Sequence, residues 1–199
     1  MKEIIMATNN AGKVKEMQSL FAELNIKVLA LKDVFSEPID VEENGTTFEE
    51  NAIIKAQTIS KMINQVVIAD DSGIEIDAMG KKPGVESARF LGHDTSYDYK
   101  NQYILDLLKN ETNRAARYVC AMAIAIPGKD TVVFRETMEG EIAYEAKGTN
   151  GFGYDPIFFF PPTNKTGAEM SLEEKNQYYH RAKETRHILE VVKEMPNNG

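Results

Sequence analysis

Val66-Val67-Ile68-Ala69-Asp70-Asp71-Ser72-Gly73 is the segment on which the fold assignment depends. Its first four residues are apolar and three of them are β-branched, a pattern typical of a buried strand. The next four residues predict a turn, so we expect this strand to deliver the carboxylates Asp70 and Asp71 to its end. The alternating residues 74–77 predict that a further strand follows.

Strands and helices alternate on both sides of this segment. Before it, the sequence predicts strands at 4–7 and 27–31, a polar turn at 8–12, and helices at 14–24 and from 47 to 63. After it, we expect a helix at 97–108, strands at 117–126 and 131–138 joined by a hairpin at 128–130, a strand at 156–160 and a helix at 171–192. Early alternation followed by a late hairpin predicts an α/β protein with a mixed sheet.

Composition places the chain among soluble globular proteins. Its 199 residues include 42% hydrophobic and 27% charged residues, and this length fits one domain or one domain divided into two lobes. The formal charge of −8, with no cluster of Lys and Arg, argues against a nucleic-acid polymer as partner. No apolar run reaches the roughly 20 residues of a membrane span or forms a signal peptide, so we expect a cytoplasmic protein without a membrane partner. Cys120, the single cysteine, lies in an apolar run and is expected to be buried.

The first candidate for chemistry is the turn Thr8-Asn9-Asn10-Ala11-Gly12-Lys13, which lies between a predicted strand and a predicted helix. Backbone N–H groups at the start of a helix attract phosphate, and Lys13 would add a positive charge. The turn is not a P-loop, because its first glycine is missing and Val14 stands where a Ser or Thr would hold magnesium. An ordinary helix cap with an exposed lysine is the alternative interpretation.

Carboxylates form the second candidate. Asp70 and Asp71 follow an apolar strand, a common place for metal ligands in α/β enzymes, although acidic residues there can also cap a turn. A carboxylate from the loop containing Glu42 and Glu43 could complete a magnesium site, and Lys55 could neutralise charge on a phosphoryl oxygen. The alternative is a solvated acidic loop with a surface lysine.

Two segments near the C-terminus could bind a nucleoside. In Gly151-Phe152-Gly153-Tyr154-Asp155-Pro156, the glycines allow close approach of the backbone, an aromatic ring could stack on a base, and Asp155 could accept from a ring N–H. On the helix predicted at 171–192, Lys175 could bind phosphate while His180 and Arg181 donate to a purine carbonyl. Residues five or six apart do not share a helix face, so all three can act together only if the ligand crosses the helix or the helix breaks.

Read together, these segments resemble the inosine triphosphate pyrophosphatase family. The matching segments occur in order and nearly from end to end, and they are Ala7 to Lys13, Thr47-Phe48-Glu49-Glu50-Asn51-Ala52, Ala69 to Gly73, Gly151 to Pro156 and His180-Arg181. The resemblance implies a single pyrophosphatase domain over residues 1–199, with an elongated mixed sheet flanked by helices and two lobes with a cleft between them. It also implies a magnesium cofactor and a homodimer.

The same resemblance implies an activity and roles for individual residues. The activity is the hydrolysis of ITP, dITP and XTP to the monophosphate and pyrophosphate, which keeps deaminated bases out of DNA and RNA. Catalysis is assigned to Asp71, as general base, and to Lys55; metal binding is assigned to Glu42 and Asp71, with Glu43 and Asp70 as alternatives. The implied substrate-binding residues are Thr8, Asn9, Asn10, Ala11, Gly12, Lys13, Ser72, Phe152, Gly153, Tyr154, Asp155, Lys175, His180 and Arg181.

Two other functions remain as alternatives. A related pyrophosphatase for modified pyrimidine or thymidine triphosphates would differ in its base pocket, and Phe152 and His180-Arg181 argue against it. A protein that binds a triphosphate without turnover would not need carboxylates around the phosphates. Arg181 can only donate hydrogen bonds, so it would bind the six-carbonyl oxygen of hypoxanthine or xanthine and disfavour the amino group of adenine.

Overall fold

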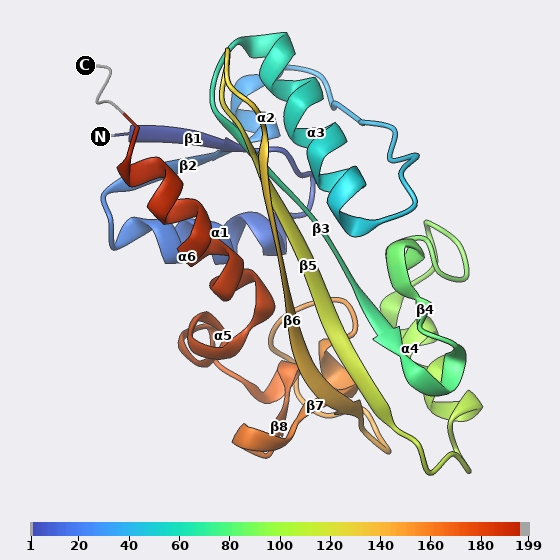
Figure 1. Cartoon of the computed structure of the whole chain (residues 1–199). Helices are drawn as coiled ribbons and strands as arrows, with labels where there is room; N and C mark the ends of the chain where they lie inside the picture. Colours follow the sequence, from blue (N-terminus) through green and yellow to red (C-terminus); the bar gives the residue numbers. More distant parts are fainter. Residues whose placement is uncertain (1, 196–199) are drawn as a thin grey trace. The chain divides into compact units, whose positions relative to one another are not determined.

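The computed structural model describes residues 2–195, except for the side chains of His180 and Arg181. Its described part contains an eight-stranded sheet with the order β2-β1-β3-β5-β6-β7-β8, and β4 pairs with β3. The mixed α/β fold with flanking helices is therefore confirmed (Figure 1). The chain divides into two compact units: residues 1–71, 120–136 and 181–199 form the first, and residues 72–119 and 137–180 form the second. None of the helices in the described residues is both long and apolar enough to cross a membrane.

The first unit begins with a parallel arrangement of three strands. Strand β1 (Lys2–Met6) pairs in parallel with β2 (Ile26–Ala30) on one side and with β3 (Val67–Ile76) on the other. The connection from β1 leads to β2 on one side of β1, and the connection from β2 leads to β3 on the other side. The strand order therefore reverses between β1 and β3. In open α/β sheets, ligands bind at the carboxyl ends of strands at such a point.

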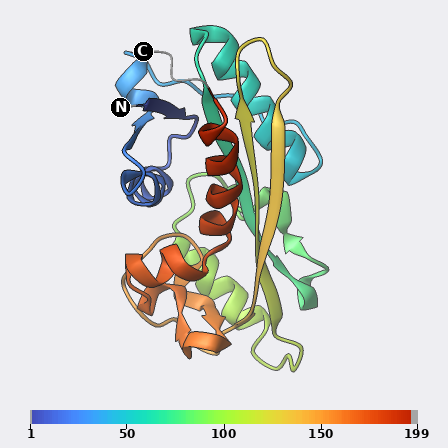
Figure 2. The ribbon, with the colours of Figure 1, turned by 60° about the vertical axis from the view of Figure 1, so that its left-hand side comes forward.

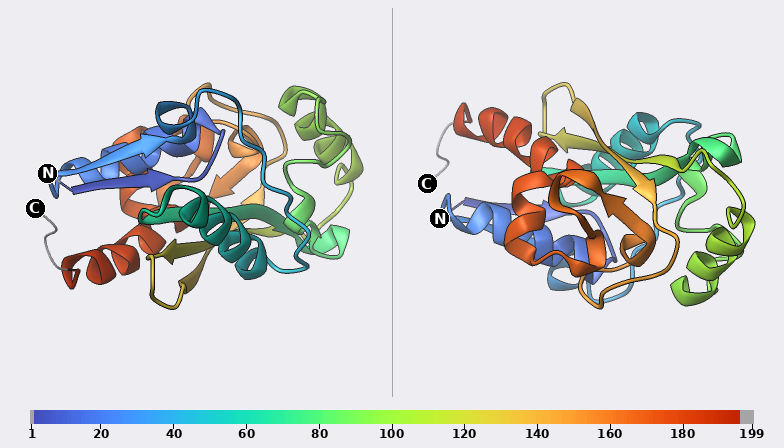
Figure 3. Two further views of the ribbon diagram at one scale, coloured as in Figure 1. Left: turned by 90° about the horizontal axis from the view of Figure 1, so that it is seen from above. Right: turned by 90° about the horizontal axis from the view of Figure 1, so that it is seen from below.

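Helices cover both faces of these strands. Helix α1 (Ala11–Ala22) connects β1 to β2, while the short α2 (Leu31–Val34) and then α3 (Phe48–Ile63) connect β2 to β3. Figures 2 and 3 show α1 and α6 (His180–Lys193) on one side of the strands and α3 on the other. The core on the side of α1 and α6 includes buried Met17, Phe21, Ile188 and Val192.

The expected hairpin is formed by β5 (Ala115–Ala125) and β6 (Val132–Ile142), which are neighbours in the sheet. Together with β3, these strands contribute residues to both units. Cys120 lies on β5 and is fully buried, as its apolar surroundings predict. The long apolar run of β5 therefore serves as core in each unit.

The second unit adds short elements around the remaining parts of β3, β5 and β6. Strand β4 (Lys82–Pro83) pairs antiparallel with β3, β7 (Phe158–Phe160) pairs antiparallel with β6, and β8 (Lys165–Thr166) pairs antiparallel with β7. Helices α4 (Tyr97–Leu107) and α5 (Leu172–Tyr178) complete it. Its own core includes Ile74, Ile104, Tyr118, Phe158 and Tyr179.

Two sequence expectations are wrong. Residues 70–73 do not form a turn, because β3 runs without interruption from Val67 to Ile76. Burial on both faces and pairing with neighbouring strands override the turn preference of Asp, Ser and Gly. The single helix expected at 171–192 is two helices, since Tyr179 adopts extended backbone angles between α5 and α6.

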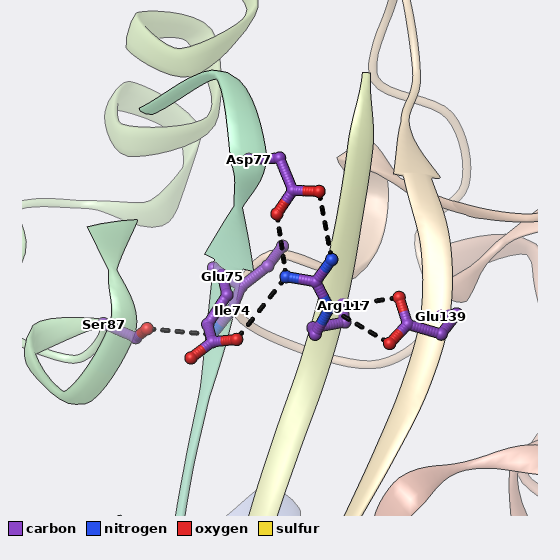
Figure 4. A network of polar contacts seen from close by, with 6 residues as sticks. All are labelled: Ile74, Glu75, Asp77, Ser87, Arg117 and Glu139. Atoms are coloured by element: carbon purple, nitrogen blue, oxygen red, sulfur yellow. Dashed lines mark hydrogen bonds and ion pairs between the residues drawn. The ribbon is translucent and has the colours of Figure 1, made fainter. Parts of the chain in front are cut away.

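Arg117 on β5 joins three strands of the second unit (Figure 4). Its guanidinium donates two hydrogen bonds to Asp77, which follows β3, and two to Glu139 on β6. Glu75 on β3 lies 3.5 Å away. Hydrogen bonding to Arg117 lowers the pKa of Asp77, and the same contacts raise the pKa of Arg117.

We expect Arg117→Met to destabilise the protein, because it leaves three carboxylates close together without their shared cation. A suitable control is Arg135→Met, since Arg135 is 47% exposed and its ion pair with Glu49 measures 3.5 Å. The loss in the free energy of unfolding should be at least about threefold larger for Arg117→Met than for the control. Urea unfolding at neutral pH measures both losses, and equal losses would contradict a structural role for the network.

Glu184 on α6 is a buried carboxyl group in the first unit. The residue is 0% exposed, and among the described residues neither of its carboxyl oxygens has a hydrogen-bond partner. Burial, together with the charges of Glu136 and Glu49, raises its pKa to about 8. Each of these two glutamates has a partner of its own, since His187 contacts Glu136 and Arg135 contacts Glu49.

The raised pKa of Glu184 predicts that stability depends on pH. In the unfolded chain this group ionises near its ordinary value of 4.5, whereas the folded protein holds the proton until about pH 8. The folded state therefore binds more protons across this window, and its contribution to the free energy of unfolding falls as pH rises from 4.5 to about 8.

Glu184→Gln should remove this decline, so the variant gains stability over the parent as pH rises while differing little at acid pH. Glu190→Gln, on an exposed position of the same helix, is the control and should leave the pH dependence unchanged. Urea unfolding across the pH range provides the measurement. Parallel stability curves for parent and Glu184→Gln would refute the prediction.

Candidate functional site

Asp70 and Asp71 lie in the middle of β3 and face opposite sides of the sheet, because successive side chains of a strand alternate. Their contacts show this alternation. Asp70 lies 3.2 Å from the ammonium group of Lys13 on α1, whereas Asp71 accepts a hydrogen bond of 3.2 Å from Asn51 on α3. Since α1 and α3 cover opposite faces, the two carboxylates have different partners and different surroundings.

Helix α3 presents two polar side chains one turn apart, Asn51 and Lys55, and both are buried. Asn51 donates to Asp71 and accepts from the backbone N–H of Gly45. Lys55 forms an ion pair of 3.1 Å with Glu43. A side chain at Gly45 would overlap the side-chain amide oxygen of Asn51, so glycine is needed for the loop to approach the helix.

The loop contacts distinguish the two adjacent glutamates. Glu43 is half-buried and paired with Lys55, while Glu42 is exposed. The assignment of Glu42 as a metal ligand stays a prediction. Of the two glutamates, Glu43 is the one that lies close to Lys55 and acts on Asp71. We call the group formed by Lys13, Glu43, Lys55, Asp70 and Asp71 the charged cluster; all five residues belong to the first unit.

Charge compensation in this cluster shifts two pKa values. Burial alone would lower the pKa of Lys55, but Asp70, Glu43 and Asp71 together raise it, so the lysine keeps its charge. Burial raises the pKa of Asp71 to about 6, although Lys55, Lys13 and the Asn51 hydrogen bond oppose this increase. Asp71 is therefore ionised at neutral pH and still basic enough to accept a proton.

The cluster can hold a hard divalent cation only if a bound substrate supplies some of the coordinating oxygens. Among the side chains that the structure describes, no three of His, Cys, Asp or Glu converge closely enough to form a metal site alone. Asp71 and Glu43 do act on one another, since the charge of Glu43 raises the pKa of Asp71. Magnesium is commonly bound by one or two carboxylates together with substrate phosphates and water, so this donor set fits an ion that arrives with a polyphosphate.

The predicted phosphate turn lies at the carboxyl end of β1, beside β3. The N–H of Ala7 donates to the carbonyl of Ile68, which brings the turn next to Asp70. Asn10 caps α1 by accepting from the N–H groups of Gly12 and Lys13. The ordinary cap is therefore present, but Lys13 is only 15% exposed and is paired with Asp70.

A separate cavity of about 300 Å³ opens on the β2 side of this turn. Thr8 and Asn9 line it together with Lys15 and Lys32. Asn9 also donates to the carbonyl of Ile39, which ties the turn to the following loop. Thr8 and Asn9 thus have space beside them, while Lys13 points to the charged cluster.

The second unit contains the predicted nucleoside-binding loop, and its centre is Asp155. This carboxylate is 3% exposed and has four protein donors. One oxygen accepts from the hydroxyls of Tyr118 and Tyr179, at 2.8 and 2.6 Å. The other accepts from Lys175 at 2.5 Å and from the N–H of Phe152 at 3.1 Å. We call Asp155 and these four partners the Asp155 hub.

These contacts change the interpretation of several predicted residues. Asp155 accepts from four donors among the described residues, and Lys175 is buried and paired with Asp155, so its contact with phosphate stays a prediction. Tyr154 is also buried, with its hydroxyl donating to the carbonyl of Ser87.

Phe152 and Gly153 remain half-buried, as does Ser72 on β3. His180 and Arg181 begin α6, but their side chains lie outside the described residues.

Sequence reasoning missed two tyrosines of the hub. Tyr118 is inside a strand whose apolar pattern gives no sign of a functional hydroxyl. Tyr179 had a signal, because Lys175 and His180-Arg181 cannot share one helix face, and this conflict allowed a helix break. The structure places the break at Tyr179, directly before His180 and Arg181.

Comparison with known proteins identifies the family of this chain. The Ham1 family model matches residues 4–191. A dITP/XTP pyrophosphatase of Geobacillus kaustophilus is 49% identical over 188 residues, covering 92% of this chain and 90% of that protein. The protein of the same name from Listeria monocytogenes is 46% identical and covers 98% of both chains.

Solved structures agree with this result. The Staphylococcus aureus Ham1 protein superposes with a TM-score of 0.84 at 41% identity, covering 96% of this chain and 98% of that one. A HAM1 protein from Coxiella burnetii gives a TM-score of 0.86 at 39% identity, covering 98% and 100%. The resemblance inferred from the five motifs is confirmed, and the chain belongs to the Ham1 family.

Proposed function

We propose that this chain hydrolyses deaminated purine nucleoside triphosphates, namely dITP, ITP and XTP, to the nucleoside monophosphate and pyrophosphate. The observation that carries this proposal is the charged cluster at the reversal point of the sheet, where two lysines lie among three carboxylates. Relatives that are 44–49% identical carry the name dITP/XTP pyrophosphatase. On the resemblance alone, we further propose a magnesium cofactor, a homodimer and a cytoplasmic location.

The residues of the first unit support attack by water on the triphosphate. Lys13 and Lys55 supply positive charge for the phosphate oxygens, and both are held close to the carboxylates before a ligand arrives. Asp71, with a pKa of about 6, is ionised at neutral pH and accepts the proton of the attacking water. Asn51 fixes the orientation of Asp71 through its hydrogen bond, so the base is positioned by a helix rather than by a mobile loop.

A magnesium ion bound with the substrate would add the positive charge needed to offset the triphosphate and to activate water. Asp71 and Glu43 are the carboxylates suited to hold it. Asp70 is less suited, because it faces α1 and is paired with Lys13. In this proposal, Asp70 keeps Lys13 in place, and the neighbouring Asp71 performs the chemistry.

Recognition of the base is assigned to the second unit and to the start of α6. Phe152 offers a half-buried aromatic ring, and Lys175 lies 5.6 Å from the centre of that ring. Arg181, by resemblance, donates to the six-carbonyl that distinguishes hypoxanthine and xanthine from adenine.

The proposed function predicts a definite order of substrates. With magnesium present, turnover of dITP, ITP and XTP should exceed that of ATP and dTTP, and the products should be the monophosphate and pyrophosphate. Pyrophosphate release, detected with added inorganic pyrophosphatase, measures the rate, and chelation of the metal should abolish it. Preference for dTTP would support a pyrimidine enzyme instead, and tight binding without turnover would support a nucleotide-binding protein.

A second prediction separates the acidic residues of the site. Asp71→Asn should lower kcat by about two to four orders of magnitude, because an amide cannot accept the proton. Glu43→Gln should also lose activity, whereas Glu42→Gln, an exposed neighbour, should remain close to the parent. Steady-state kinetics on dITP at saturating magnesium, with circular dichroism to verify folding, measure all three. A folded Asp71→Asn protein with parental activity would remove Asp71 from the mechanism.

A further inference from the structure

The break between α5 and α6 falls at Tyr179, a residue of the Asp155 hub. Tyr179 ends α5 in an extended conformation, and its backbone N–H donates to the carbonyl of Lys175 at 2.8 Å. Its hydroxyl donates to Asp155 at 2.6 Å, and its ring lies 4.8 Å from the ammonium group of Lys175. Tyr179 therefore contacts both members of the buried ion pair and directly precedes His180 and Arg181.

Gly167 provides the space that this hydroxyl occupies. A Cβ atom at Gly167 would overlap the Tyr179 hydroxyl oxygen and would also approach the carboxyl group of Asp155. The backbone of Gly167 is not in the left-handed region, so its conformation alone does not require glycine. The absence of a side chain at this position is therefore explained by the Tyr179 contact.

The hub connects three parts of the proposed nucleoside-binding region. Asp155 fixes the N–H of Phe152, the ammonium group of Lys175 and the hydroxyl of Tyr179 at the same time. A carboxylate with this many donors keeps its position and so limits the movement of each partner. Removing one donor should loosen the other partners without unfolding the unit, because three donors remain.

We propose that Tyr179 is a positioning residue for nucleoside recognition: its hydroxyl, seated in the space left by Gly167, holds Asp155 and Lys175 and fixes the chain at the point where His180 and Arg181 follow. This inference rests on the proposed function and assigns no direct contact between Tyr179 and the substrate. It predicts an effect on substrate affinity and selectivity that exceeds any effect on the chemical step.

Tyr179→Phe is the test, and Tyr178→Phe is the matched control. Tyr178 is the adjacent tyrosine; its ring packs against Phe160, and its hydroxyl is not one of the four donors to Asp155. For Tyr179→Phe we expect KM for ITP to rise about tenfold, which corresponds to the loss of roughly one hydrogen bond. The change in kcat should be smaller, and the ratio of kcat/KM for ITP to kcat/KM for ATP should fall. Tyr178→Phe should keep the parental constants.

A second pair of variants tests the steric relation. Gly167→Ala should reproduce the rise in KM, because its methyl group displaces the Tyr179 hydroxyl. Adding Tyr179→Phe to Gly167→Ala should raise KM no further, since both changes remove the same hydroxyl contact. A double variant that is worse than Gly167→Ala would overturn the steric part of the proposal.

Hydrogen exchange measured on the same proteins distinguishes failure of this inference from failure of the proposed function. Tyr179→Phe should speed amide exchange in peptides covering 152–155 and 172–180, with little change in Tm, whether or not the parent turns over ITP. Parental kinetics, or parental exchange, in a folded Tyr179→Phe protein would overturn the positioning role. An inactive parent would instead refute the proposed function, and the exchange comparison would still decide whether Tyr179 holds the hub.

Discussion

The rest of the site depends on the compensation of two carboxylates buried within a β-strand. A charged group inside a sheet is costly unless cations or hydrogen-bond donors meet it, and β3 buries two such groups in succession. Alternation along the strand directs Asp70 to α1 and Asp71 to α3, so each helix must supply its own compensating group. Lys13 does this at the start of α1, and Asn51 and Lys55 do it on one face of α3.

This requirement explains why the chemistry is concentrated where the strand order reverses. The carboxyl end of β1 lies beside β3 there, so the first turn of α1 reaches Asp70. Helix α3 arrives on the other face, and the loop before it places Glu43 against Lys55. Elements separated by dozens of residues thus meet because of topology, and the fold itself assembles the charged cluster.

Much of the fold could be predicted from the sequence because local patterns and tertiary structure agree. The apolar stripes of α1 and α3, the cap at Thr47 and the β5–β6 hairpin follow from periodicity and turn residues. Disagreement arose where burial overrode local preference, as in residues 70–73, whose composition favours a turn. The single C-terminal helix was expected from the residue pattern, although the spacing of Lys175 and His180-Arg181 allowed a break. The break lies at Tyr179, whose hydrogen bond to Asp155 is a tertiary contact that the sequence does not show. For the same reason, the sequence could not show that Asp155 and Lys175 satisfy one another.

The alternation of Asp70 and Asp71 also determines where the chain can tolerate insertions and deletions. Strand β3 is aligned with β1 through the pairs Ile5 with Val67 and Met6 with Ile68. Inserting or deleting one residue between Ile68 and Asp70 would reverse the faces of both carboxylates, placing Asp71 opposite Lys13 and removing it from Asn51. Such a change would alter the composition by one residue and leave a strand of similar hydrophobicity, while exchanging the faces of the two acids. Length variation is therefore expected to be excluded from this strand and tolerated in exposed connections such as 109–113.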